Sequence, residues 1–159
     1  SAAWRAEADA ANATIADTSN VLLLRPEAGQ VIFPPPRPPG VPGTLVLISI
    51  YVLAAQTEAA FASFFEQDVT PELRLLGGAP FATFVTDRSP NAYPRQPVRD
   101  ETVFVTLTRF ASNADYQRFI AAGSASAVWR ERVQPEIARH LAAPVEVLRL
   151  QPTARSALR

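Results

Sequence analysis

The chain has 159 residues, of which 48% are hydrophobic and 19% are charged, values typical of a single globular domain. Its 15 arginines balance 15 acidic residues, so it offers no basic surface for a nucleic acid, and no apolar run is long enough to span a membrane. Because cysteine and lysine are absent, disulfides, thiolate catalysis and Schiff-base chemistry are excluded.

The first part of the chain predicts one helix, one strand and one linker. Residues 1–16 are expected to form a helix, because apolar side chains recur there at helical spacing. The apolar run Val21–Leu24 predicts a buried strand that Pro26 ends. Residues 33–43 contain six prolines and predict a stiff polyproline linker, which could be a spacer or a ligand for an SH3-like domain.

Residues 44–152 predict a complete α+β unit. Alternating apolar residues predict a strand at Leu45–Leu53, and Glu58–Leu76 has the apolar stripe of a helix that Pro71 should kink or break. A second strand is expected at Phe81–Thr86, followed by a long loop at Arg88–Asp100.

The second half of this unit repeats the pattern of strand, helix and strand. A strand is expected at Thr102–Phe110, and Ser112–Asp115 resembles a capping box that opens a helix through Ile120. A further helix is expected at Ala125–Leu141, with Pro135 as its weak point, and a last strand at Val145–Leu150. The order β-α-β-β-α-β predicts a ferredoxin-like fold.

The beginning of the chain repeats its end. Ser1–Arg5 is echoed by Ser126–Arg130, and Val21–Pro26 by Val147–Pro152. An internal repeat is a stronger indication of domain organisation than the secondary-structure propensities of single residues. We therefore expect the last helix and strand of a truncated first repeat at 1–32, a spacer at 33–43, a complete repeat at 44–152 and a tail at 153–159.

Three stretches resemble bacterial proteins of the NIPSNAP family. They are the C-terminal segment Val147–Ser156, the loop Asn91–Arg99 with the strand after it, and the helical segment Phe65–Pro71. The resemblance implies a dimeric α/β barrel, in which two ferredoxin-like sheets close into one barrel. The family's first strand commonly carries a Glu-x-Arg-x-Tyr alternation, but the matching positions here are Leu47, Ser49 and Tyr51, so only the tyrosine remains.

Two residues are candidates for catalysis, Tyr51 and His140. His140 is the only histidine, which excludes a histidine-based metal cluster but leaves a general base. The alternative is a histidine favoured electrostatically by its position at a helix C-terminus. We expect no metal and no cofactor.

The long loop supplies the candidate ligand-binding residues. Tyr93, Arg95, Arg99 and Asp100 lie within it, and arginines in such a loop can hold an anionic ligand. The alternative is a loop that its prolines shape, with these side chains solvated or paired locally.

Two functions follow from these expectations. The first is binding of a small molecule in the barrel, with cofactor-free oxidative chemistry as an extension. The second is a non-catalytic structural or protein-interaction module. The expected partner is a second copy or the missing N-terminal part of the first repeat, without nucleic acid or membrane. Because the chain lacks methionine, we expect that Ser1 is not the natural start, and we expect a bacterial cytoplasmic location.

Overall fold

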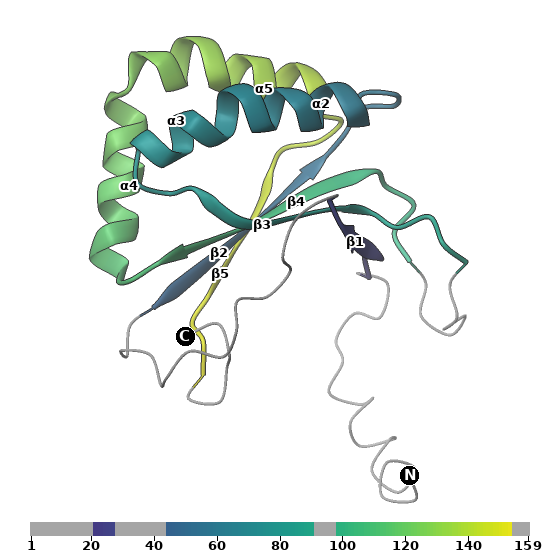
Figure 1. Ribbon diagram of the computed structural model, residues 1–159, viewed down its shortest axis with the longest axis horizontal. Helices are drawn as coiled ribbons and strands as arrows, with labels where there is room; N and C mark the ends of the chain where they lie inside the picture. The colour runs from purple at the N-terminus through teal and green to yellow at the C-terminus, as the bar shows by residue number, and fades with distance from the viewer. Residues whose placement is uncertain (1–20, 28–43, 91–97, 154–159) are drawn as a thin grey trace, which may run out of the picture. The chain divides into compact units, whose positions relative to one another are not determined.

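The computed structural model describes residues 21–27, 44–90 and 98–153. Its contacts divide the chain into a smaller unit, Ser1–Leu23 with Asp87–Asp100, and a larger unit, Leu24–Thr86 with Glu101–Arg159. All the regular helices and strands named below belong to the larger unit (Figure 1). The helix predicted over residues 1–16 and the linker predicted over 33–43 lie outside the described residues.

The larger unit contains one antiparallel sheet with the strand order β1-β3-β4-β2-β5. The strands are β1 (Leu24–Pro26), β2 (Leu45–Val52), β3 (Pro80–Thr86), β4 (Val103–Phe110) and β5 (Glu146–Leu150). Strands β2 to β5 and the helices between them follow the predicted β-α-β-β-α-β order, so the ferredoxin-like α+β fold is confirmed.

The predicted position of the first strand was wrong by three residues at its start and by two at its end. We expected Val21–Leu24, whereas β1 is Leu24–Pro26 and pairs with β3. Proline has no N–H to donate, but β1 is the outermost strand, so Pro26 can occupy it without removing a bond between two inner strands. Val21 instead forms an isolated parallel bridge with Val98 in the smaller unit.

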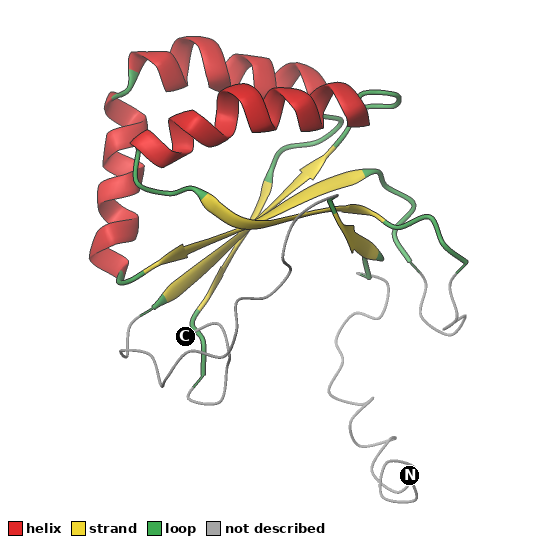
Figure 2. Cartoon of the chain, in the orientation of Figure 1, coloured by secondary structure: helices red, strands yellow, loops and turns green. Residues whose placement is uncertain are grey.

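The helices lie on one face of the sheet (Figure 2). Tyr51 and Phe104 point toward them and belong to the main hydrophobic core. Val46 and Val105, on the opposite face by strand alternation, are also buried. Each face of the sheet therefore carries apolar core residues, as the alternation in the sequence predicted.

The first helical segment runs without a break through a proline. It consists of α2 (Glu58–Phe64), a π-helical turn η1 (Phe65–Val69) and α3 (Thr70–Leu75). We expected Pro71 to kink or break this helix. The helix does not break there, and the turn before the proline is widened. The N–H of Thr70 donates to the carbonyl of Phe65, five residues back, so the missing N–H of Pro71 is accommodated without ending the helix.

The second helical segment also contains a π-helical turn, but it is interrupted at Ser126. It consists of α4 (Asn113–Ala125), a π-helical turn η2 (Trp129–Val133) and α5 (Gln134–His140). The predicted end of the first helix at Ile120 was wrong. The alanines after Ile120 favour the helix, which continues through Gly123 and ends before Ser126, whose backbone is extended. Again the π-helical turn ends two residues before a proline, Pro135.

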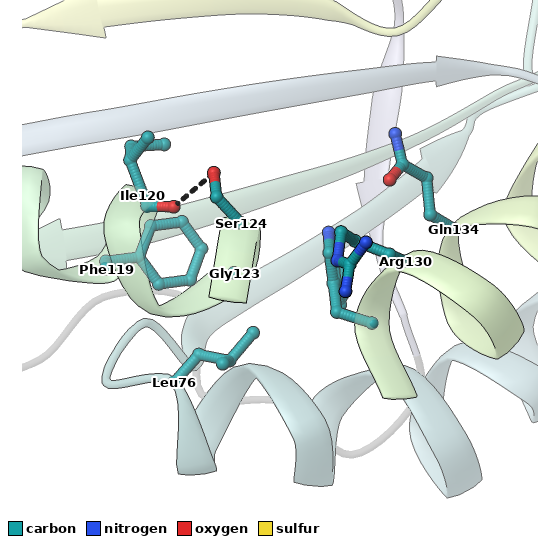
Figure 3. A pocket seen from close by; sticks show the side chains of 8 residues that line it. Leu76, Phe119, Ile120, Gly123, Ser124, Arg130 and Gln134 are labelled. Atoms are coloured by element: carbon teal, nitrogen blue, oxygen red, sulfur yellow. Dashed lines mark hydrogen bonds between the residues drawn. The ribbon is translucent and has the colours of Figure 1, made fainter. Parts of the chain in front are cut away.

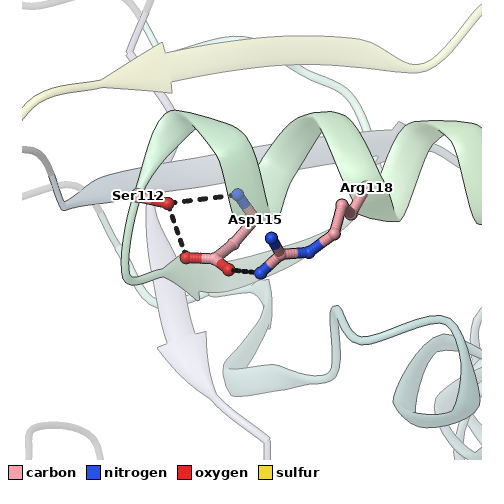
Figure 4. A network of polar contacts seen from close by, with 3 residues as sticks. All are labelled: Ser112, Asp115 and Arg118. Carbon is pink, nitrogen blue, oxygen red and sulfur yellow. Dashed lines mark hydrogen bonds and ion pairs between the residues drawn. The ribbon is translucent and has the colours of Figure 1, made fainter.

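The start of α4 confirms the predicted cap. Ser112 Oγ accepts a hydrogen bond from the backbone N–H of Asp115 at 3.1 Å and donates one to the Asp115 carboxylate at 2.6 Å (Figure 4). Arg118, one turn later, forms an ion pair with the same carboxylate. The cap satisfies an N–H that would otherwise lack a partner inside the helix, and it fixes where α4 leaves the sheet.

Candidate functional site

Tyr51, the predicted catalytic tyrosine, lies on β2 between the sheet and the helices, and its side chain is buried. Its ring centroid is 5.4 Å from that of Phe61, 5.6 Å from that of Phe65 and 6.3 Å from that of Phe104. Phe65 and Phe104 are themselves 4.9 Å apart. Aromatic rings therefore surround Tyr51 on the helical side of the sheet.

The hydroxyl of Tyr51 has two polar neighbours within this aromatic surrounding. It forms side-chain hydrogen bonds with Ser49 and Thr106. These two residues are direct register partners on β2 and β4, and strand alternation places Tyr51 on their face. The three hydroxyl groups form one polar cluster, in which Tyr51 and Thr106 are buried and Ser49 is half-buried, and which we call the Tyr51 cluster.

Burial decides the acidity of Tyr51. Loss of solvation raises the pKa of its hydroxyl to about 12, although the hydrogen bonds from Ser49 and Thr106 act in the opposite direction. A group with this pKa stays protonated at neutral pH, so it can take part in hydrogen bonds but supplies no phenolate base.

His140, the second catalytic candidate, ends α5 and contacts two phenylalanines. Its ring stacks on Phe64 at 5.8 Å with an interplanar angle of 20°, and it meets Phe61 edge-on at 5.6 Å. Its Nε2 lies 3.6 Å from Glu136 Oε1, and its side chain is 17% exposed. The backbone carbonyl of His140 accepts a hydrogen bond from the N–H of Ala54, which follows β2.

Phe61 contacts the rings of both catalytic candidates, Tyr51 and His140. The fold therefore brings these two residues, predicted from distant parts of the sequence, into one neighbourhood. Each already has polar partners of its own, the Tyr51 cluster for the tyrosine and Glu136 for the histidine. In the described structure they belong to one aromatic core, and no interaction between the two side chains is seen.

The predicted ligand-binding residues belong to the smaller unit. The backbone N–H of Arg99 donates to the carbonyl of Val21 at 2.9 Å, and Asp100 is exposed. Tyr93 and Arg95 lie outside the described residues, so the predicted anion site in this loop stays a prediction.

Sequence reasoning missed the partners of Tyr51. Alternation along β2 already placed Ser49 on the tyrosine's face. Thr106 could be identified as a partner only from the register of β2 and β4, which places it opposite Ser49. No residue pattern in the two strands specified that register.

The described residues offer no site for a metal, and none of their helices could cross a membrane. Within residues 21–27, 44–90 and 98–153, no three histidine or acidic side chains are grouped so that they could hold an ion. The helices there are too short or too polar to span a bilayer.

Sequence comparison and structural comparison give different results. No protein-family model matches the chain, and no curated protein is significantly similar to it in sequence. Among solved structures, an uncharacterised NIPSNAP-like domain protein from Burkholderia xenovorans has a TM-score of 0.59 at 24% identity, covering 73% of this chain and 90% of that protein.

Two NIPSNAP family proteins from Agrobacterium tumefaciens are similar to the same extent. One has a TM-score of 0.59 at 18% identity, covering 74% of this chain and 95% of its own, and its function is unknown. The other has a TM-score of 0.58 at 18% identity, with 75% and 94% covered. At these identities the likeness concerns the fold, and it supports the resemblance seen in the sequence motifs: the chain has the α+β fold of NIPSNAP family proteins.

Proposed function

We propose that the chain is a NIPSNAP-type unit whose function is to pair its sheet with that of a second unit, as a structural or protein-interaction module. The observation that carries this proposal is the exposure of β5. Val147, Leu148 and Leu150 are 51%, 47% and 45% exposed, although β5 is a regular strand of the sheet. An outer strand with large exposed apolar side chains is a site for pairing with another chain.

The repeat in the sequence supports a specific mode of pairing. Leu24–Pro26, which forms β1, corresponds to Leu150–Pro152 at the end of β5. Since β1 pairs antiparallel with β3, we expect Leu150–Pro152 to pair with a β3-type edge of a second unit. That unit would be the preceding repeat, or a second copy of the chain in which Leu150–Pro152 takes the place of β1 on β3. The two sheets would together form the barrel.

The interior of the larger unit favours assembly over catalysis at Tyr51. Phe61, Phe65 and Phe104 pack around the tyrosine, and its hydroxyl bonds to Ser49 on its own strand and to Thr106 on β4. A catalytic acid or base must reach its substrate, whereas a hydroxyl with this surrounding stabilises the sheet.

Small-molecule binding in the barrel, with cofactor-free oxidative chemistry, is the second candidate function. It is supported by the same Tyr51 cluster, since a polar group inside an aromatic interior can orient an apolar ligand, with His140 one aromatic ring away. Tyr93, Arg95, Arg99 and Asp100 remain separate candidates for holding an anionic ligand in their own loop.

Sedimentation velocity over a wide concentration range tests the pairing. We expect the chain to associate, and Leu148→Asp to abolish association because it places a charge on the exposed strand. Leu75→Asp is the matched control, since Leu75 is 82% exposed on α3, away from the sheet. A chain that stays monomeric throughout, or that loses association equally with both variants, contradicts the proposal.

A further inference from the structure

The exposed large apolar side chains of the described residues form two separate groups. One is the β5 group discussed above. The other lies on the helices and consists of Leu75, Ile120 and Val128, which are 82%, 43% and 45% exposed. Sheet pairing does not account for this second group, because none of its members belongs to a strand.

One member of this group, Ile120, lines a groove with a volume of about 360 Å³, which lies between α4 on one side and η2 with the start of α5 on the other (Figure 3). Leu76, at the end of α3, forms a third wall. The apolar lining includes Phe119, Ile120 and Trp129, and all the lining residues come from helices or their ends. The volume is within the range of small-molecule sites.

Gly123 keeps the floor of this groove open. It lies within α4, and a Cβ built on it would be 3.9 Å from the indole Cδ1 of Trp129 and 4.0 Å from Cδ1 of Leu76, which is ordinary contact. Its φ is not positive, so the backbone does not require glycine here. The missing side chain therefore leaves space next to the indole, at a position where alanine would favour the helix.

The polar side of the groove has a positive charge and no negative one. Arg130 and Gln134 line it one turn apart, and no acidic residue does. The nearest carboxylate that pairs with Arg130 is that of Glu131, at 3.9 Å and with a side chain that is 73% exposed. An ion pair of this length and exposure is weak, so the guanidinium can accept an anionic partner.

The π-helical turn η2 determines this arrangement. Trp129 and Arg130 lie within it, and the N–H of Gln134 donates to the carbonyl of Trp129 five residues back. Turns of this kind are often found at functional sites because they reposition side chains relative to a regular helix. Here the turn brings the indole, the guanidinium and the Gln134 amide to one groove.

We propose that this groove binds a small apolar carboxylate, with its hydrocarbon body between Trp129, Phe119 and Leu76 and its carboxylate at Arg130 and Gln134. The apolar walls match the body, and the unbalanced positive charge matches the carboxylate. This site is separate from the Tyr51 cluster and from β5, so it does not rest on sheet pairing.

The test uses octanoate as the probe, with octan-1-ol and octylamine as its neutral and cationic counterparts. Binding is followed by the indole Nε1–H NMR signal of Trp129, in a Trp4→Phe background that leaves Trp129 as the remaining tryptophan. We expect octanoate to shift this signal saturably, octan-1-ol to bind roughly three- to tenfold more weakly, and octylamine to leave it unchanged.

Two substitutions examine the charge and the space. Arg130→Gln should reduce octanoate binding to the level of octan-1-ol, whereas Arg132→Gln, in the same turn but outside the lining, should not. Gly123→Leu should abolish binding of all three probes by filling the floor. Gly123→Ala fills the floor only in part and should weaken binding. This variant replaces Gly123→Leu in the test if the leucine variant does not fold.

Three results would overturn the proposal. The first is an indole signal that no probe shifts. The second is equal affinity for octanoate and octan-1-ol, which would mean that Arg130 does not contact the ligand. The third is an equal loss of octanoate binding in Arg130→Gln and Arg132→Gln, which would assign the effect to net charge.

Discussion

Ser126 Oγ donates a hydrogen bond to Glu72 Oε1 at 2.9 Å, joining two helical segments that are 54 residues apart in the sequence. The same oxygen accepts the backbone N–H of Trp129 at 3.1 Å. One hydroxyl therefore caps the helix that leads into η2 and ties it to α3. The end of α3 and η2 form two walls of the groove, and this contact holds these two walls together.

Replacing Ser126 by alanine should destabilise the larger unit by about 1–2 kcal/mol, because it removes both a helix cap and a bond to a carboxylate. Urea unfolding followed by circular dichroism measures the change. Ser124→Ala is the control, since Ser124 is exposed and its Oγ donates only to the carbonyl of Ile120 in its own helix. Equal losses in the two variants would show that the link to Glu72 contributes little.

Three glycines should respond differently to alanine. A Cβ on Gly78 would lie 2.5 Å from the ring of Phe119, so Gly78→Ala should cost about 1–3 kcal/mol through overpacking. Gly77→Ala should cost about 1 kcal/mol, because its φ of 91° strains any side chain. Gly123→Ala should stabilise by about 0.5–1 kcal/mol through helix propensity. Thermal unfolding of the three variants checks this order, and a destabilised Gly123→Ala would show that its floor cannot take a methyl group.

Tyr51→Phe should destabilise the fold by about 1 kcal/mol, because Thr106 is then buried without its tyrosine partner. Adding Thr106→Val should recover part of this loss, since it removes the hydroxyl left without that partner. A double-mutant cycle in urea measures the coupling between the two residues. Additive losses would show that the hydroxyls of the Tyr51 cluster do not stabilise one another.

The strands and the buried helical stripes could be predicted because their periodicity is explicit. The buried stripe was expected to consist of Phe61, Phe65, Val69, Leu73 and Leu76. Leu76 is half-buried, whereas the first four, which recur at every fourth residue, are buried. Their constant spacing of four residues exceeds the helical period of about 3.6, so on a regular helix the stripe would rotate by about 40° at each step. The wider π-helical turn offsets this drift, and the spacing was a signal for it that we did not use.

The two π-helical turns also follow a shared sequence pattern. In Phe65–Leu73 and in Trp129–Ile137, an aromatic residue is followed at fixed spacing by valine, proline, glutamate and a branched aliphatic residue. Propensity alone predicts a break at each proline, because it treats the missing N–H as a lost α-helical bond. In the structure, the π-helical turn before each proline accommodates the missing N–H. This turn depends on the burial of Val69 and Val133 against the sheet, and helix propensity takes no account of such tertiary contacts.

The site was predictable only in part. Alternation identified the face of Tyr51, and the position of His140 at a helix end was correct. Their shared contact with Phe61 depends on how the helices cross the sheet, which the sequence does not specify. The groove at Trp129 was not predicted, because no sequence pattern distinguishes a tryptophan that packs in a core from one that lines a groove. Trp129 packs against the core and also lines the groove.

Stability should fall at high pH because of Tyr51. Burial raises the pKa of its hydroxyl from 10.0 to about 12, so the folded state retains a proton that the unfolded state releases. This contribution is fully present below the unfolded-state pKa and is lost as pH rises through the folded-state pKa, with a slope of at most about 1.4 kcal/mol per pH unit. Urea unfolding between these two pH values measures the slope, and Tyr51→Phe is its control. If the variant retains the same slope, other groups cause the alkaline loss and Tyr51 is not the residue that titrates.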